Sequence, residues 1–322
     1  MIAEPIVAIF LALLIDFTFG DPKNKFHPTV WIGTLIAKLV PYLQNSSYTF
    51  EKLAGICVII IPAFAVVLFL FFLGMVLDMI TGLLYTILSI SIVAVLLKLT
   101  IAIKGMEKHA IDVVASLEAG NLDAARERLS MIVKRDTKDL DEDQVYSAVV
   151  ESISENTVDG VTGPLFYFGF FGLFGAFVYR AINTADSMVG YKTSIFRSVG
   201  WFAATSDKIL NYIPSRLTGL VMVFCSILLQ NNWKESYRIM IRDCKKTESP
   251  NAGYPMAAAA GALDVKLEKL DHYSIGDGNT HFSKKHVVST ITLMKVTSIV
   301  FVMIIVVPTI SFMSYLGWWV HV

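Results

Sequence analysis

Five long stretches of the chain carry no charged side chain, and they constrain its fold more than any other feature. Residues 53–77 and 296–320 each run for 25 residues without Asp, Glu, Lys or Arg, and 79–97, 160–179 and 217–233 run for 19, 20 and 17. A helix needs about 20 mostly apolar residues to cross the hydrocarbon core. Only 17% of the 322 residues are charged, against about 25% in an average soluble domain. The sequence therefore predicts an all-α, polytopic integral membrane protein.

The start of the chain is also apolar and resembles a secretory leader at first sight. Residues 1–19 contain no Lys or Arg, carry Glu4 early, and show no small-x-small cleavage pattern before Gly20. A signal peptide has a basic first region and such a pattern. We therefore expect residues 2–19 to form a retained first span or half-span, with Asp16 near its inner end.

The charged residues are distributed unevenly. Residues 105–160 contain 6 Lys and Arg against 13 Asp and Glu, although the formal net charge of the chain is 0. Nucleic-acid binding requires the opposite clustering, with a basic stripe or patch, so we expect no nucleic-acid partner. Cys57, Cys225 and Cys244 show no metal-ligand or redox spacing, which predicts small core residues rather than a disulfide framework or zinc site.

The order of apolar and polar stretches divides the chain into five segments. They are N-terminal spans with a polar loop (1–103), polar helices (104–159), a motif-rich membrane or re-entrant region (160–233), a polar loop (234–288) and a C-terminal span (289–322).

The basic residues of the short loops predict the orientation of these segments. Lys23, Lys25 and Lys38 lie in loop 20–50, whereas the turn near Asp78 has no basic residue. Short cytoplasmic loops carry the excess of Lys and Arg, so we expect the polar helices and the active site in the cytoplasm of a multi-pass protein of the cell membrane. The polar stretch 184–214 would then lie outside, unless 160–214 re-enters or breaks around a cavity.

The polar segment 104–159 contains recognisable helix-start signals. Asn121 is a candidate N-cap, and Asp141 with Gln144 forms a capping-box variant. We expect the second helix to run from Glu142 to about Asp159.

Three carboxylates follow one side of that helix. Glu151, Glu155 and Asp159 are four residues apart, which places them within about 80° at 100° per residue. Such a stripe is either a solvated face or, at a membrane boundary, a site for hydrated Mg²⁺, which prefers oxygen ligands. Asn156 lies beside it.

A second polar cluster ends the apolar stretch 160–179. Its members are Arg180, Asn183, Asp186, Ser187 and Tyr191. The spacing of Gly169, Gly172 and Gly175 before them predicts close helix packing rather than a phosphate loop. Ionisable residues at membrane depth are costly and tend to pair or to line a functional cavity. The cluster is therefore either an internal Arg180–Asp186 pair that holds a bundle together or part of a site.

Four further clusters have both a structural and a functional interpretation. They contain Asp21 and His27 in a Pro-bounded turn, Arg135 in a charged helix terminus, Asp207 and Asn211 one helical turn apart before Arg216, and Asn251 in a Pro/Gly loop before the helix 256–263. We expect Pro214 to end the helix that carries Asp207 and Asn211. Turns, caps and headgroup contacts explain each cluster alone, whereas arginines and helix N-termini are also common anion ligands.

Taken together and in this order, the clusters resemble those of the CbiB/CobD family, the adenosylcobinamide-phosphate synthases of cobalamin biosynthesis. The matching stretches are GDPKNKFHP (20–28), KRDT (134–137), ESISENTVDGVTGPLFY (151–167), YRAINTADSMVGYK (179–192), DKILNYIPSRLT (207–218) and SPNAGYPMAAAAGAL (249–263). One departure is Ser206, where the family commonly has a second aspartate.

The resemblance implies an ATP-dependent ligase that joins adenosylcobyric acid to (R)-1-aminopropan-2-ol or its O-phosphate. Catalysis is then expected from Glu151, Glu155, Asp159 and Asp186, with Mg²⁺ on the last three. Substrate contacts are expected from Asp21, His27, Arg135, Asn156, Arg180, Asn183, Ser187, Tyr191, Asp207, Asn211, Arg216 and Asn251. The expected partners are the corrinoid, the aminopropanol compound, the lipid bilayer and later enzymes of the pathway.

Two other functions remain open on the sequence. One is a membrane transporter in which Arg180 and Asp186 line a permeation path, although the single polar segment and the lack of inverted repeats disfavour it. The other is a non-catalytic membrane regulator of the distantly related AmpE type.

Overall fold

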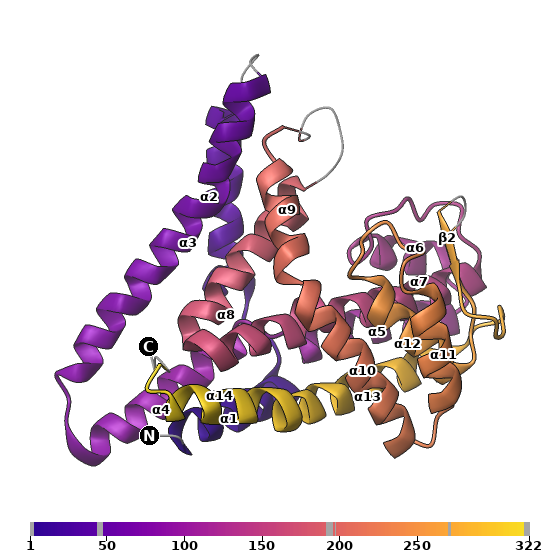
Figure 1. Ribbon diagram of the computed structural model, residues 1–322. Coiled ribbons are helices and arrows are strands. Elements are labelled where there is room, and N and C mark those ends of the chain that lie inside the picture. The colour runs from indigo at the N-terminus through magenta and orange to yellow at the C-terminus, as the bar shows by residue number, and fades with distance from the viewer. Residues whose placement is uncertain (1–2, 44–47, 191–195, 197, 270–271, 319–322) are drawn as a thin grey trace. The chain divides into compact units, whose positions relative to one another are not determined.

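The computed structural model describes residues 3–43, 48–190, 196, 198–269 and 272–318, and these are almost entirely helical (Figure 1). The elements are α1 (Ala3–Phe19), η1 (Asn24–Phe26), α2 (Pro28–Leu43), α3 (Tyr48–Asp78), α4 (Gly82–Lys98), α5 (Ile103–Glu118), α6 (Leu122–Ser130), α7 (Glu142–Thr157), η2 (Val158–Thr162), α8 (Gly163–Val189), α9 (Trp201–Leu210), α10 (Tyr212–Leu228), α11 (Trp233–Asp243), α12 (Gly253–Leu263), β1 (Leu267–Lys269), β2 (Tyr273–Ile275), α13 (Lys284–Phe301), η3 (Val302–Val306) and α14 (Val307–Tyr315).

The chain forms two compact units, each assembled from segments far apart in the sequence. The first, called the span unit here, contains Met1–Ala102, Gly163–Leu210 and Val302–Val322. The second, called the polar unit, contains Ile103–Thr162 and Asn211–Phe301.

In the span unit, α2, α3, α8 and α9 pack around an apolar core. Ile36, Val58 and Ala185 are fully buried in it. By contrast, Phe64, Phe69 and Phe72 of α3 leave more than half of their surface exposed. Large exposed apolar side chains on a long uncharged helix are the pattern expected of a surface that faces lipid.

In the polar unit, α7 contacts α5, α6, α12 and α13. Its apolar side, with Val145, Val149 and Ile153, is buried as the periodicity predicted. The hairpin of β1 and β2, with Leu267 opposite Ile275, lies against the same unit. Helices α11 and α12 approach closely, since a Cβ added at Gly261 would lie 2.3 Å from the Glu235 carbonyl oxygen. Small residues in α12 permit that packing.

The prediction of a helical membrane protein is confirmed. Among the described residues, four helices are long and apolar enough to cross a membrane, Thr49–Asp78, Gly82–Glu118, Glu142–Val189 and Lys284–Tyr315, and a fifth counts if Trp201–Leu210 and Tyr212–Leu228 form one broken span. The segment predicted as a first span is α1, a 17-residue helix outside these candidates.

The local helix signals were interpreted correctly at their starts. The Asn121 side chain accepts a hydrogen bond from the Ala124 N–H, and Asp141 and Gln144 form a complete capping box. Cys57, Cys225 and Cys244 are free, with only Cys57 half-buried.

Two predicted helix ends were wrong. The helix that starts at Glu142 does not stop near Asp159 but continues through the π-helical turn η2 into α8. This wider turn precedes Pro164, which lacks the N–H that a regular helix requires. Pro214 also breaks nothing, because it lies in the first turn of α10 and the break is at Asn211. A proline is tolerated in a first turn, where the N–H has no helical partner.

The glycines of 169–175 were predicted to serve close helix packing, and only some do. Gly169 lies against Val306 and Thr309, but Gly172 has φ +59° and stands at a kink in α8 with Phe171. A positive φ is a conformation that glycine adopts at little cost.

Candidate active site

A buried carboxylate, Glu151, is the centre of a polar network in the polar unit. Only 6% of its surface is exposed. The Ser147 hydroxyl donates to its Oε1 at 3.1 Å, and the Tyr273 hydroxyl donates to its Oε2 at 2.8 Å. The Arg135 guanidinium lies 3.5 Å from the same Oε2. A carboxylate at this depth is tolerated because it is paired and hydrogen-bonded.

Three separate elements position these side chains. The capping box fixes the start of α7, and Glu151 lies two turns further along, one turn after Ser147. Arg135 lies in the connection between α6 and α7. Two hydrogen bonds hold this connection: the Thr137 hydroxyl donates to the Arg126 carbonyl at 2.9 Å, and Arg126 Nε donates to the Leu140 carbonyl at 2.8 Å. The β hairpin presents Tyr273.

The protonation state of Tyr273 follows from its surroundings. Burial raises the pKa of this phenol, and the negative charges of Glu151 and Glu155 raise it further. The hydroxyl therefore remains protonated and acts as a donor at neutral pH. Tyr273 thereby fixes one oxygen of Glu151 while the charge of that carboxylate is balanced by Arg135.

Beside this network lies an open hollow of about 470 Å³. It is lined by Asp123, Arg126, Glu127, Ser130, Arg135, Asp136, Thr137 and Lys138. Arg135 is thus shared, since it contacts the buried Glu151 and also lines the hollow. A guanidinium held from behind by a buried carboxylate is preorganised to bind an anion with its remaining N–H groups.

Glu155 and Asp159 lie further along the same helix and have different environments. Glu155 is exposed, while Asp159 is half-buried and accepts a hydrogen bond from the Asn211 amide at 3.0 Å. Asn156 instead donates to the Ser152 carbonyl at 2.8 Å. Because Asp159 lies inside the π turn, the assumption of 100° per residue fails between it and Glu155.

The donor chemistry of this pair fits the predicted Mg²⁺. That ion is commonly held by one or two carboxylates together with water and phosphate oxygens, and Glu155 and Asp159 supply two carboxylates one turn apart. The third predicted ligand, Asp186, belongs to the span unit. In the part of the chain that the structure describes, no group of three or more His, Cys, Asp and Glu side chains is placed to hold a metal ion.

The span unit contains a second group of predicted residues. Arg180 donates to the Asn183 side-chain oxygen Oδ1 at 3.3 Å, and the Asn183 side-chain amide donates to Asp207 Oδ1 at 3.2 Å. This connects α8 with α9. Asp186 and Ser187 lie on the same helix as Asn183, and Tyr191 falls outside the described residues.

Asp21 and His27 form another pair in the span unit. Their Oδ1 and Nε2 atoms are 3.6 Å apart, and Lys98 of α4 contacts Asp21 at 2.5 Å and Asp16 at 3.4 Å. The predicted turn at Gly20–Pro28 is therefore tied to a membrane helix by a buried lysine.

Arg216 and Asn251 are brought together in the polar unit. Arg216 lies 3.5 Å from the Asn251 side-chain oxygen, and its guanidinium stacks over the rings of Tyr212 and Tyr254. Two aromatic faces hold the guanidinium plane in one orientation.

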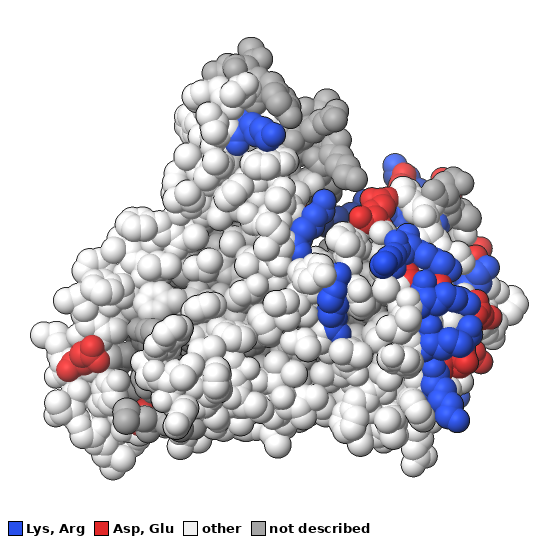
Figure 2. All heavy atoms as spheres, viewed as in Figure 1, with Lys and Arg blue, Asp and Glu red and all other residues white. Residues whose placement is uncertain are grey.

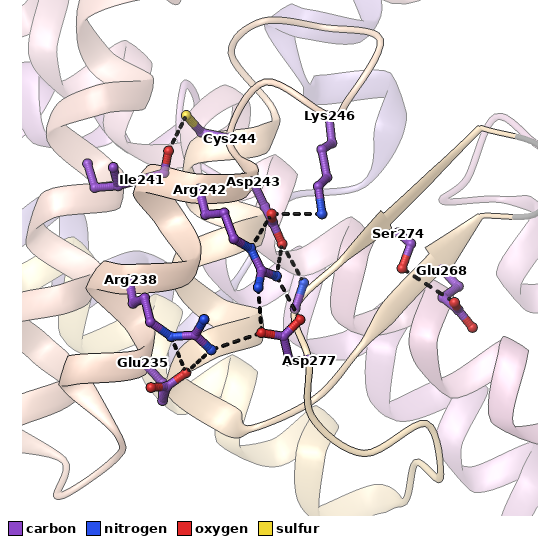
Figure 3. A network of polar contacts seen from close by, with 11 residues as sticks. Glu235, Arg238, Ile241, Arg242, Asp243, Cys244, Lys246, Glu268, Ser274 and Asp277 are labelled. Atoms are coloured by element: carbon purple, nitrogen blue, oxygen red, sulfur yellow. Dashed lines mark hydrogen bonds and ion pairs between the residues drawn. The ribbon is translucent and has the colours of Figure 1, made fainter.

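The sequence analysis missed several residues of these networks. Tyr273 and Lys98 are separated from their partners by 122 and 77 positions, so no local spacing could indicate them. Figure 3 shows another missed group, in which Arg242 lies between Asp243 and Asp277. An isolated Lys in the apolar stretch 79–103 was the one available signal for Lys98.

Comparison with known proteins decides the family. The family model described as CobD/Cbib protein matches residues 9–317. The chain belongs to the CobD/CbiB family. It is 41% identical to a probable cobalamin biosynthesis protein CobD of Methanothermobacter thermautotrophicus over 91% of this chain and 94% of that protein.

Two further relatives show the same full-length similarity. A cobalamin biosynthesis protein CobD of Dehalococcoides mccartyi is 39% identical over 85% of this chain and 87% of its own. A cobalamin biosynthesis protein CobD of Leptospira interrogans is 38% identical over 90% of this chain and 93% of its own. No solved structure matches the chain.

Proposed function

We propose that this protein acts in cobalamin biosynthesis as an ATP-dependent acid–amine ligase, joining adenosylcobyric acid to (R)-1-aminopropan-2-ol or its O-phosphate. The observation that carries the proposal is Arg135, which lies within the KRDT stretch, lines an open hollow and is held by the buried Glu151. Membership of the CobD/CbiB family supplies the pathway.

The reaction needs an activated carboxylate, because a carboxylate and an amine do not condense unaided. In the proposed sequence a carboxylate oxygen of the corrinoid attacks the γ-phosphorus of ATP, and the bond to the β-phosphate oxygen breaks to release ADP. The amine nitrogen then attacks the acyl carbon, phosphate leaves with its electron pair, and the amine loses a proton to a base. Groups that bind the phosphate oxygens lower both barriers.

The described residues suit these requirements in the polar unit. Arg135 binds and orients an anionic group in the hollow, and Glu151 and Tyr273 hold the guanidinium in place. Mg²⁺ bound through Glu155 and Asp159 would neutralise charge on the transferred phosphoryl group. Arg216 with Asn251 forms a second anion-binding pair.

The proposal assigns the span unit to substrate binding. Asp186, Asn183 and Asp207 would contact the corrinoid or the amine, and Asp21 with His27 would do so from the first loop. We place the proposed residues of each unit on the cytoplasmic side, where ATP is available, and we expect later enzymes of the pathway to associate with the protein.

The test uses the full chain in lipid nanodiscs with adenosylcobyric acid, aminopropanol or its phosphate, ATP and Mg²⁺. An amide product with stoichiometric ADP is expected from the native protein, and Glu155→Gln should abolish it. Glu268→Gln, an exposed carboxylate on β1, is the matched control and should retain activity. A folded native protein that yields no amide product, with either amine, would support the non-catalytic regulator instead.

A further inference from the structure

Helix α11 has an exposed apolar stripe that the proposed ligase chemistry does not use. Trp233, Tyr237 and Ile241 are spaced four residues apart and expose 42%, 51% and 57% of their surface. At 100° per residue these three side chains occupy about 80° of the helix circumference. Single exposed apolar residues are ordinary, but an aligned stripe of large ones marks an interaction surface.

The rest of the circumference of α11 consists of a buried side and an exposed basic side. Ser236, Ile239, Met240 and Asp243 are buried, on the side of α11 that packs on α12. Beyond the stripe, Lys234, Arg238 and Arg242 are exposed, and exposed Lys245 follows the helix. Arg238 pairs with Glu235 and Asp277, and Arg242 pairs with Asp243 and Asp277. Among the described contacts, Lys234 and Lys245 have no carboxylate partner. The helix therefore has one buried side, one apolar stripe and one basic side, in that order around its axis.

The charge of the segment is positive. Between Trp233 and Lys246 there are five Lys and Arg against two Asp and Glu. Figure 2 shows Lys and Arg gathered over the region of α11. Basic side chains beside an apolar stripe allow a helix to lie in the plane of a bilayer interface, with the stripe in the acyl boundary and the basic groups among the headgroups.

The place of α11 in the chain supports a lipid partner over a protein one. The preceding α10 exposes Ile213, Leu220, Phe224 and Ile227 along one helical stripe, as a helix in contact with lipid does. The connection between α10 and α11 is only four residues long. Gln230 in it has φ +58°, and the Asn231 N–H donates to the Ser226 carbonyl at 2.8 Å.

This tight turn determines where α11 begins. The Asn232 side chain caps α11 by accepting a hydrogen bond from the Glu235 N–H at 3.2 Å. Helix α11 therefore starts about one turn after the end of α10. A tryptophan at that position matches the aromatic belt found where membrane helices leave the hydrocarbon core.

We propose that α11 is a membrane-surface helix that inserts Trp233, Tyr237 and Ile241 into the headgroup–acyl boundary of a bilayer and binds anionic headgroups through Lys234 and Lys245. Helix α11 would thereby hold the polar unit against the bilayer, close to the end of α10.

The experiment uses the full chain with Cys57→Ser, since the two other cysteines are buried. An environment-sensitive fluorophore is attached at Tyr237→Cys or Ile241→Cys, with Glu268→Cys on β1 as the matched control. The protein is placed in nanodiscs of phosphatidylcholine with phosphatidylglycerol. Quenching by a lipid-borne nitroxide is compared with quenching by aqueous iodide.

Lipid-borne quenching should be about threefold stronger at 237 and 241 than at 268, with the opposite order for iodide. Equal iodide quenching at all three positions would place the stripe in water and overturn the proposal. Protection from both quenchers would show that a protein surface covers the stripe, which also overturns it.

A second comparison, between nanodiscs with and without phosphatidylglycerol, tests whether α11 binds anionic headgroups. With phosphatidylcholine alone, lipid-borne quenching at 237 should decrease, and Lys234→Gln with Lys245→Gln should remove the difference between the two nanodiscs. An unchanged signal without phosphatidylglycerol would contradict binding of anionic headgroups. Neither outcome depends on ligase activity, so the membrane-surface helix and the proposed function fail separately.

Discussion

At the scale of single residues, the Tyr273 hydroxyl is a hydrogen-bond donor to the buried Glu151 carboxylate. It donates to Glu151 Oε2, the same oxygen that faces Arg135. Its removal deletes one hydrogen bond to a charged, buried carboxylate, and such a bond contributes about 1.5–3 kcal/mol.

Tyr273→Phe should therefore lower product formation about tenfold, since each 1.4 kcal/mol of lost stabilisation is a factor of ten. The measurement is kcat/KM for the amide product in nanodiscs, with Ser274→Ala of the same strand as control. The control should keep native kinetics, because Ser274 bonds only the exposed Glu268 among the described contacts, at 3.4 Å. Native kinetics in Tyr273→Phe would remove Tyr273 and the orientation of Glu151 from the account.

At the scale of elements, the Asp243 network connects α11 with the loop after β2 (Figure 3). Asp243 is buried and accepts from Arg242 at 2.7 Å and from the Gly276 N–H at 2.9 Å, and Lys246 lies 2.7 Å away. Burial alone would raise the pKa of Asp243, but these donors outweigh it and hold the pKa well below the ordinary 3.8. Arg242 and then Arg238 lower the pKa of exposed Asp277 to about 2.

A carboxyl group with a lowered folded-state pKa stabilises the fold fully above its unfolded pKa and loses that contribution as the pH falls toward the folded value. The difference in thermal transition between the native protein and a variant that lacks both carboxylates, Asp243→Asn with Asp277→Asn, should therefore be constant down to about pH 4 and decrease between about pH 4 and pH 2, where these carboxylates gain protons.

Asp243→Asn should lower the free energy of unfolding by about 1.5–3 kcal/mol at neutral pH, because it removes the charged acceptor of the Arg242 and Gly276 hydrogen bonds at a buried position. Asp277→Asn is the matched control at an exposed position and should cost less. Unfolding in detergent, followed by intrinsic fluorescence, measures both variants. Equal transitions for Asp243→Asn and the native protein would show that the network does not hold α11 to the hairpin.

The elements also show what the sequence could predict. Helix starts depend on contacts within four residues, so the cap at Asn121 and the capping box at Asp141 were predicted from sequence. The π turn and the kink at Gly172 were not, because a Gly-Pro pair in an apolar stretch indicates a helix end and a kinked continuation equally well.

The candidate site was predictable only in part. Arg135, Glu151, Asp159 and Asn211 were predicted as site residues from the sequence, but the pairing of Arg135 with Glu151 and of Asp159 with Asn211 was not, because these contacts join different helices and loops. Tyr273 lies in no matching stretch, and its importance follows only from the hairpin that carries it to Glu151. Sequence patterns identify residue types for a site, whereas packing determines which of them meet.

At the scale of the whole molecule, the sidedness of the polar stretches is the main requirement of the account. Asp207 and Asn211 must share a compartment with ATP if they contribute to the site, and exposed Lys208 lies between them in the sequence. Lys208→Cys and Glu127→Cys should therefore react with a membrane-impermeant maleimide from the same side of sealed vesicles, in the Cys57→Ser background. Met79→Cys, in the turn expected outside, should react from the other side. Reaction of Lys208→Cys from the side of Met79→Cys would contradict a single cytoplasmic site.

The central claim is that the protein activates a corrinoid carboxylate by phosphorylation and transfers the acyl group to an amine. The most direct measurement labels that carboxylate with ¹⁸O and analyses the inorganic phosphate released with the amide. The account predicts one labelled oxygen in phosphate for each amide formed, because the carboxylate oxygen that attacks ATP leaves with the phosphoryl group. Amide formation with unlabelled phosphate, or no amide from the folded protein, would contradict it.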